Sequence, residues 1–289
     1  MKLDEILRKA TEEHWAIGHF NISNLEQLRA IMEAAKKLKS PIMIGVSERE
    51  RKFIGLKQCV ALIKAFKEEY DLPVFLNPDH SHSIESAVEA FDAGFESIHI
   101  DLSNSPFREN LKGTKEVVDY VKSKNPDVSI EGELGYLRGE SKIQRDIIEI
   151  KSEDLTKPEE AAEFVEKTGI DRFSGAYGNI HGISVNEPGL DIQKIKEIRR
   201  ILPKHISMVL HGGSGIPDNQ IRSAINAGIA NIHVNTEIRV AYTEALRKFL
   251  TNNPDEVVPY KIFPSVIESV QKKVEEKLRL FGSMNKICI

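Results

Sequence analysis

The sequence predicts a parallel (β/α)8 barrel with an additional C-terminal helix. Short β-branched apolar runs recur eight times along the 289 residues, and each is followed by a longer stretch whose apolar residues repeat at helical spacing. Eight such alternations within about 250 residues are typical of a closed parallel barrel. A doubly wound open sheet is the alternative, but the first strand-to-helix turn lacks the G-x-G-x-x-G pattern of its dinucleotide-binding version.

The expected elements follow one another along the whole chain. The eight strands are residues 16–22, 41–47, 73–80, 97–103, 127–135, 172–182, 207–214 and 231–236. The helical stretches between them include residues 25–38, 84–94, 157–169, 191–202 and 218–228. Many of these stretches open with Asp, Asn or Pro and close with Gly, the usual asymmetry of helix starts and stops.

A C-terminal extension follows the eighth strand. Residues 237–250 are expected to be helical, residues 251–265 are rich in helix breakers, and residues 266–282 form a last amphipathic helix. This extension either plugs the barrel or forms a contact between subunits. Because the sequence contains no linker or low-complexity segment, residues 1–289 are expected to form a single barrel domain.

Composition argues against several classes of partner. The formal net charge is −4 with both signs spread along the chain, so no basic block is available to follow a nucleic-acid backbone. No run approaches the roughly 20 apolar residues of a membrane span, and the N-terminus lacks a signal-peptide core, so a cytoplasmic protein is expected. The cysteines, Cys59 and Cys288, are too few for a disulfide framework or a cysteine metal cluster.

Polar side chains gather at the C-terminal ends of the expected strands, where parallel barrels bind their ligands. In strand order they are Asp79, His80, Asp101, Ser103, Glu131, Glu133, His181, His211, Asn235 and Thr236. The strand interiors are otherwise apolar or small, so these groups are expected on one rim of the barrel.

Three of these residues, His80, His181 and His211, are histidines that are distant in sequence. Three protein ligands with an open position are the pattern of a catalytic zinc, for which neutral imidazole is a good ligand. One histidine at a barrel mouth is more often an ordinary hydrogen-bonded residue, but three at equivalent positions favour a shared ion. The competing candidates are His82, His99 and His233.

Glycine-rich segments after strands seven and eight predict an anion site. The runs "HGGSG" (211–215) and "HVNT" (233–236) lie where many parallel barrels hold a phosphate with backbone N–H groups, a hydroxyl and a helix N-terminus. Glycine permits close backbone approach, and Ser214 or Thr236 would supply the hydroxyl.

Two features of the fifth strand and its loop leave alternatives open. Glu131 and Glu133 are two residues apart, so their side chains share one face. Either they are acids on a solvated face, or at least one orients a histidine from behind the metal. Residues 136–154 form a long, polar connection, which is either a lid or a solvated insertion.

In order and spacing these motifs resemble the class II, zinc-dependent ketose-bisphosphate aldolases, the fructose-bisphosphate and tagatose-bisphosphate enzymes. The resemblance covers essentially the whole chain. The matching segments are "HFNISNLEQLRAI", "DHSHSIESAVEAFDAGFESIHIDLSNSPFREN", "EGELGYLRGE", "GNIHG", "VLHGGSGI", "VNTEIRVA" and "FGSMNKI".

The resemblance implies a role for each candidate residue. It implies that the three histidines bind Zn2+ and that Asp79 exchanges a proton with the substrate hydroxyl. Glu140 would be the base at the carbon next to the ketone, and Asp101 and Glu133 would hold a second or alternative divalent metal position. The residues implied to bind dihydroxyacetone phosphate are Gly182, Gly212, Gly213, Ser214, His233, Val234, Asn235 and Thr236. Ser47 would contact the second phosphate with Arg49 or Arg51, and some relatives hold a monovalent cation near the glycines.

The chain departs from the family pattern at three places. His233 stands where relatives usually carry Asn, and the loop "LRGES" has one acid where many relatives have two. The basic "DPR" pattern, through which some members reach a neighbour's phosphate site, is replaced by "NPDEVVPYKIF", which leaves Lys261 as a substitute.

The predicted function is therefore the reversible, zinc-dependent cleavage of fructose 1,6-bisphosphate to dihydroxyacetone phosphate and glyceraldehyde 3-phosphate, a lyase reaction of glycolysis and gluconeogenesis. Zinc would stabilise the charge on the ketone oxygen, so no lysine Schiff base is required. The alternatives are a tagatose-1,6-bisphosphate aldolase, a metal-dependent sugar-phosphate epimerase or isomerase, and a non-catalytic binder of zinc or sugar phosphate. The resemblance also favours a homodimer or homotetramer.

Overall fold

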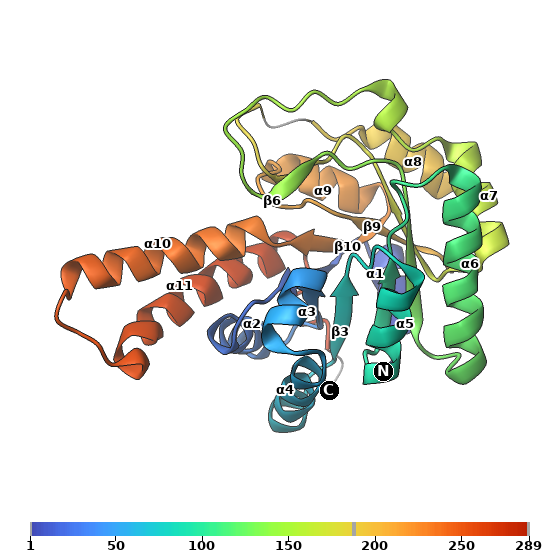
Figure 1. The fold of residues 1–289 in the computed structure, drawn as a ribbon. Coiled ribbons are helices and arrows are strands. Elements are labelled where there is room, and N and C mark those ends of the chain that lie inside the picture. Colours follow the sequence, from blue (N-terminus) through green and yellow to red (C-terminus); the bar gives the residue numbers. More distant parts are fainter. Residues whose placement is uncertain (1, 187–188, 288–289) are drawn as a thin grey trace.

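Figure 1 shows the computed structural model, which describes residues 2–186 and 189–287. Eight strands form one parallel sheet in the order β3-β2-β1-β10-β9-β7-β5-β4. A bridge between Ser81 and Ile100 joins the end strands β3 and β4, so the sheet is a nearly closed barrel. Its strands are β1 (Ile17–Asn21), β2 (Ile42–Ser47), β3 (Val74–Asp79), β4 (Ser97–Ile100), β5 (Ser129–Leu134), β7 (Arg172–Gly175), β9 (Ser207–Leu210) and β10 (Ile229–Val234). The predicted barrel is confirmed.

The sixth barrel strand is shorter than expected. The prediction of a strand over residues 172–182 is wrong beyond Gly175, because the chain turns at Gly178, which has φ +94°. Instead β8 (His181–Ile183) pairs in parallel with β6 (Gly139–Ile143), which comes from the long connection after β5. His181 therefore lies on a small second sheet above the barrel rather than on a barrel strand.

Helices occupy the connections between the strands and have the expected starts and stops. The side chains of Asn24, Ser83 and Asp191 each accept a backbone N–H at a helix start, and Gly94 and Gly169 end helices in the left-handed conformation. These helices are α2 (Leu25–Leu38), α3 (Glu48–Ile54), α4 (Leu56–Tyr70), α5 (Ile84–Ala93), α6 (Phe107–Lys124), α7 (Pro158–Thr168), α8 (Ile192–Ile201) and α9 (Asp218–Asn226), with a 3-10 turn at Ser152–Asp154.

The N-terminal helix α1 (Leu3–Glu12) closes the bottom of the barrel and was not anticipated from the sequence. Its apolar face packs on side chains from the N-terminal halves of the strands. The cluster comprises Leu3, Ile6, Leu7, Ala10, Trp15, Ile17, Met43, Phe75 and Ala230. The N-terminal helix is therefore the barrel plug.

The C-terminal extension forms an antiparallel helical pair, α10 (Thr236–Asn252) and α11 (Pro259–Leu280), which projects from the side of the barrel (Figure 1). The inner part of α11 packs on α2, so the extension is not a barrel plug. The expected break over residues 251–265 is also too long, because α11 begins at Pro259. Pro is favourable at the first helical position, and Pro264 removes one hydrogen bond near the start of the helix.

The interior of the barrel changes from apolar to polar along its axis. Its lowest layer consists of apolar side chains that contact α1, and the layers above contain polar side chains from most of the strands. The buried polar residues include His19, Asn77, Ser97, His99, Ser129, Glu131, Arg172 and Asn231. Parallel barrels are more commonly filled with branched apolar residues, so this polar filling needs a hydrogen-bonding explanation.

Two expectations from composition can be compared with the structure. Within residues 2–186 and 189–287, no helix combines the length and apolar character that a membrane span requires. Cys59 is a buried free thiol, as its place in an amphipathic run indicated, whereas Cys288 lies outside the described residues.

We expect Leu7→Ala to lower the free energy of unfolding by about 2–5 kcal/mol, because Leu7 is fully buried in the plug and its loss leaves a cavity. Urea denaturation at fixed metal concentration measures the change. Leu25→Ala is the control, since 44% of Leu25 is exposed, and it should change the same free energy by less than about 0.5 kcal/mol. Equal effects of both variants would show that α1 does not stabilise the barrel.

Candidate active site

A cleft of about 660 Å³ opens at the C-terminal ends of the strands. Its walls come from α3, the β4–α6 turn, β6 and the start of α10. Below it, a cavity of about 20 Å³ is lined by Asp79, His80, His181 and His211. About 10–15 Å³ is enough to hold one water molecule, so the lower cavity suits a single ion.

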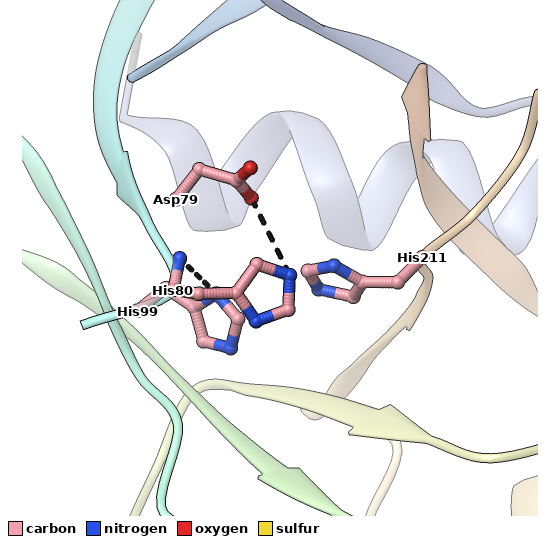
Figure 2. A group of neighbouring side chains, drawn as sticks. All are labelled: Asp79, His80, His99 and His211. Carbon is pink, nitrogen blue, oxygen red and sulfur yellow. Dashed lines mark hydrogen bonds and ion pairs between the residues drawn. The ribbon is translucent and has the colours of Figure 1, made fainter. Parts of the chain in front are cut away.

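The three predicted histidines converge at this cavity. His80 follows β3 in the left-handed conformation, with φ +49°, and His181 begins β8. The ring centroid of His80 lies 4.6 Å from that of His211 and 5.0 Å from that of His181. Figure 2 shows His80 and His211 close together, with Asp79 above and His99 beside them. Although His181 is not on a barrel strand, the β6–β8 sheet brings it over the barrel mouth, with its ring centroid 6.3 Å from that of His211. The ligand atoms that lie within 4.8 Å of one another here are those of Asp79, His80, His99 and His211.

Two buried carboxylates lie beside His80. Asp101 Oδ2 is 2.7 Å from His80 Nδ1, and Glu133 Oε2 is 3.6 Å from the same nitrogen. The ligand atoms of these three residues lie within 4.8 Å of one another. Burial and the nearby Asp101 charge raise the pKa of Glu133 well above its usual value, so a divalent cation here would favour the ionised form.

The donor set fits zinc. Burial and the neighbouring histidines lower the pKa of His181 to about 3, and burial also lowers the pKa of His211, so both imidazoles are neutral and can coordinate a metal. At His80 the Asp79 and Glu133 charges outweigh burial and raise the pKa, so a metal ion bound there would take the place of its proton. Within the described residues, Glu133 Oε2 and His99 Nε2 are buried without a hydrogen-bond partner. Because His99 Nδ1 accepts a hydrogen bond, its Nε2 carries the proton and lies 3.3 Å from Glu133 Oε2. The buried acceptor that a cation could use beside the imidazoles is therefore the Glu133 carboxylate.

Asp79 is held as a carboxylate beside His80. Burial by itself would raise its pKa, but the His80 charge and the hydrogen bond from His233 outweigh burial and hold the pKa well below the usual value. Asp79 Oδ2 accepts from Asn21 Nδ2 at 2.8 Å, and Oδ1 lies 3.2 Å from His233 Nδ1. An ionised, oriented carboxylate at the cavity can remove a proton from a bound hydroxyl.

The predicted anion segments meet at the start of α10. Gly182 and Gly212 have φ +91° and +64°, and a Cβ at Gly212 would collide with the Ile180 carbonyl oxygen. Asn235 Oδ1 and Thr236 Oγ1 are buried there with no hydrogen-bond partner among the described residues. Gly213, Ser214, His233 and Val234 are also buried around this point. The Thr236 hydroxyl can donate a hydrogen bond to an anion at the N-terminus of this 17-residue helix, whereas Asn235 Oδ1 can only accept one.

The other expected residues lie higher on the cleft wall. Glu140 is exposed on β6 and forms an ion pair of 2.7 Å with Lys142, whose hydrogen bond lowers the pKa of Glu140. Ser47 and Arg49 line the cleft, and Ser47 also caps α3. Arg51 is instead buried against Ser81 and Ser86, and Lys261 pairs with Glu256 on the projecting arm.

Of the competing histidines, His99 and His233 lie inside the histidine cluster. His99 is fully buried, with its Nδ1 accepting from the His80 backbone N–H at 3.2 Å, and the His233 ring lies 4.0 Å from that of His211. The side chain of His82 is 54% exposed, and its Nδ1 lies 3.4 Å from Asp101 Oδ2. His82 is therefore at the rim of the cleft.

Sequence reasoning missed three groups around the site, two beneath it and one beside the cleft. His19 stacks on His233 with ring centroids 3.5 Å apart, Arg172 is fully buried, and Glu50 accepts from Arg239 at 2.6 Å. The available signal was a charged or imidazole side chain inside an apolar strand, as in "AIGHFNI" and "RFSGA".

Comparisons with known proteins agree with one another. Residues 1–286 match the family model described as fructose-bisphosphate aldolase class-II. The chain is 39% identical over 289 residues to the probable fructose-bisphosphate aldolase of Bacillus subtilis (strain 168), covering 99% of both chains. It is also 39% identical over 293 residues to the 6-phospho-5-dehydro-2-deoxy-D-gluconate aldolase of Bacillus licheniformis, covering 100% of this chain and 97% of the relative.

Solved structures show the same likeness. The YdjI aldolase from Escherichia coli K12 superposes with a TM-score of 0.83 at 31% identity, over 99% of this chain and 98% of that one. A putative fructose-1,6-biphosphate aldolase from Coccidioides immitis gives a TM-score of 0.86 at 26% identity, over 99% and 97%. The fold and the arrangement of its elements are thus shared along the whole chain.

We expect Asp79→Ala and His211→Ala to separate proton transfer from metal binding. Asp79→Ala should retain zinc, because three imidazoles remain, but lose about 10²–10⁴-fold in ketose-bisphosphate turnover. His211→Ala should lose zinc on dialysis, and the exposed His205→Ala should change neither property. Zinc content and turnover of each purified variant provide the test, and loss of zinc from Asp79→Ala would make Asp79 a ligand instead.

Proposed function

We propose, on the premise that the chain belongs to the class II fructose-bisphosphate aldolase family, that it cleaves fructose 1,6-bisphosphate reversibly to dihydroxyacetone phosphate and glyceraldehyde 3-phosphate. The family is one of zinc-dependent lyases. The observation that carries the proposal is the convergence of His80, His181 and His211 beside the Asp79 carboxylate. The cleft above them has a volume usual for small-molecule sites, which is about 300–1,000 Å³.

In this proposal Asp79 and Glu140 each carry out one of the two proton transfers. In cleavage, the Asp79 carboxylate takes the proton of the hydroxyl on the carbon that becomes the aldehyde, and the carbon–carbon bond breaks. Glu140, which would have to leave Lys142 and take a proton from solvent first, then gives that proton to the carbon next to the ketone, and each carboxyl reverses its role in condensation. Bound at the three histidines, zinc supplies Lewis-acid stabilisation of the charge on the ketone oxygen. Because Glu140 lies exposed on β6, the proposal requires the β6 loop to move toward the cavity.

The two ends of the substrate would bind at opposite sides of the cavity. We assign the phosphate of the ketone half to the backbone of Gly182, Gly212 and Gly213 and to the side chains at the start of α10. The other residues assigned to this phosphate are Ser214 after β9, His233 and Val234 at the end of β10, and Asn235 and Thr236 at the start of α10. Ser47 would bind the second phosphate, with Arg49 as the cation beside it, because both line the cleft.

Further cations are part of the proposal. His80, Asp101 and Glu133 would hold a second or alternative divalent metal position, which their ligand atoms, lying within 4.8 Å of one another, support. A monovalent cation would lie near the glycines that bind the phosphate. Neither position is needed for the proton transfers at Asp79 and Glu140.

A second candidate substrate follows from the Bacillus licheniformis relative, whose name describes a ketose with a carboxylate at its far end. Cleavage of the bond between the α- and β-carbons of that ketone would also release dihydroxyacetone phosphate, and the aldehyde half would carry a carboxylate in place of a phosphate. Arg49 and Arg239 in the cleft wall are compatible with either anion. Tagatose 1,6-bisphosphate remains a further alternative, and it differs from the fructose compound at one hydroxyl.

A coupled assay that detects the triose phosphate product tests the proposal. Fructose 1,6-bisphosphate, tagatose 1,6-bisphosphate and 6-phospho-5-dehydro-2-deoxy-D-gluconate are compared, each with and without a chelator. We expect fructose 1,6-bisphosphate to have the highest kcat/KM, and we expect activity to disappear on zinc removal and to return on its addition. Activity that survived complete zinc removal would contradict the mechanism, and turnover without triose phosphate would favour an epimerase or isomerase.

Assembly and location are part of the same proposal. We propose a single barrel domain over residues 1–289 in a cytoplasmic homodimer or homotetramer. The projecting α10–α11 arm is the proposed contact, because its tip exposes 81% of Val257 and 79% of Tyr260.

We expect the double variant Val257→Glu/Tyr260→Glu to have a lower molar mass than the unmutated protein, because charge disfavours burial of the arm. Light scattering on a sizing column measures the mass. Ile147→Glu changes an exposed apolar residue in the loop after β6 and is the control. A monomeric parent protein, or an unchanged mass in the double variant, would exclude the arm as the contact.

A further inference from the structure

An ion pair lies inside the barrel, beneath the proposed metal site. Arg172 Nη1 is 2.7 Å from Glu131 Oε2, and both side chains are completely buried. The two residues face each other in register on the neighbouring strands β7 and β5. Neither residue is among those to which the proposed chemistry gives a task.

The Arg172 guanidinium is fixed from several strands at once. Its Nε donates to Ser129 Oγ at 3.2 Å, and its Nη2 donates to Asn77 Oδ1 at 3.2 Å and to the Ile98 carbonyl oxygen at 3.3 Å. Since β3, β4 and β5 all supply acceptors, the guanidinium has one orientation in the barrel. The Glu131 carboxylate, which is paired to it, is therefore also held in place.

The second oxygen of this carboxylate reaches a proposed metal ligand. Glu131 Oε1 lies 2.6 Å from His211 Nε2. A carboxylate only accepts hydrogen bonds, so His211 Nε2 must carry the proton of this bond. Its other nitrogen, Nδ1, then has the lone pair that a metal requires.

We propose that Arg172 and Glu131 are positioning residues that fix the tautomer and ring orientation of His211, so that Nδ1 is presented to the metal. This inference rests on the proposed function, because it concerns the ligand set assigned there. It also gives a reason for the ion pair. A buried pair often stabilises a fold no better than apolar residues of similar size, so stability alone does not account for a charged barrel interior. Of the two acids on β5, Glu131 is thus the one that acts from behind the metal.

The decisive variant removes both charges. Glu131→Leu/Arg172→Met leaves no unpaired charge and fills similar space, so we expect it to fold with a cooperative melting transition. His211 would lose its acceptor, and the zinc dissociation constant, measured by chelator competition on the metal-free protein, should rise about 10–100-fold. Arg199→Met is the matched control, because Arg199 donates to the Ile206, Leu202 and Pro203 carbonyl oxygens. It removes a partly buried guanidinium that has no contact with the site, so its zinc affinity should be unchanged.

A spectroscopic measurement applies even where the double variant does not fold. Nitrogen-15 NMR of the metal-free parent protein should show the His211 proton on Nε2. A proton on Nδ1 would overturn the inference, and so would a folded double variant that binds zinc as tightly as the parent. Failure of the proposed function gives a different result, because His211→Ala would then retain zinc in the parent background.

Discussion

The polar interior of the barrel depends on one buried charge, the guanidinium of Arg172. Moving an ion of this size out of water costs several kcal/mol even after the protein relaxes, and the cost is offset only where its hydrogen bonds and its opposite charge are supplied. Here Glu131 supplies the charge, and Ser129, Asn77 and the Ile98 carbonyl supply acceptors. The guanidinium therefore connects groups on four strands, and these contacts fix the positions of the polar side chains above it.

The Arg172 guanidinium also orients the side chains that contact Asp79. Because Asn77 Oδ1 faces Arg172, the amide nitrogen of Asn77 faces His19 and lies 3.1 Å from its Nε2. His19 stacks on His233, whose Nδ1 contacts the Asp79 carboxylate. This stack also accounts for Gly45 on β2, since a Cβ there would collide with the His19 ring. The buried polar side chains beneath the site therefore contact both a proposed metal ligand, His211, and the Asp79 carboxylate.

The sequence contained enough to predict the barrel and the rim of the site, but not the layer beneath them. Strand number and strand ends follow from local periodicity, and Asp79 and His80 come directly after an apolar run, so both could be placed. His181 was assigned to the correct rim but the wrong element, because glycine turns after Gly175 do not reveal which strand follows. The unusual position of Arg172 in a strand is visible in the sequence, but its partners and those of the α1 plug could not be predicted, because they lie on strands that are distant in sequence. Such contacts form only when the barrel closes.

The Asp79 carboxylate is also held from the side of the cleft opening, by a series of hydrogen bonds that leads to β6. Arg239 Nη1 donates to the Ser141 carbonyl oxygen on β6 at 2.9 Å, and its Nη2 donates to Glu50 Oε1 at 2.6 Å. Glu50 Oε2 accepts from Asn21 Nδ2 at 3.0 Å, and the same amide nitrogen donates to Asp79 Oδ2. A continuous series of hydrogen bonds thus connects β6, the strand that carries Glu140, to the Asp79 carboxylate. The far side of that carboxylate contacts the histidine stack, and His80 and His211 lie at the ends of barrel strands. His181 is instead on β8, which pairs with β6, so a movement of β6 would shift this proposed ligand together with Glu140.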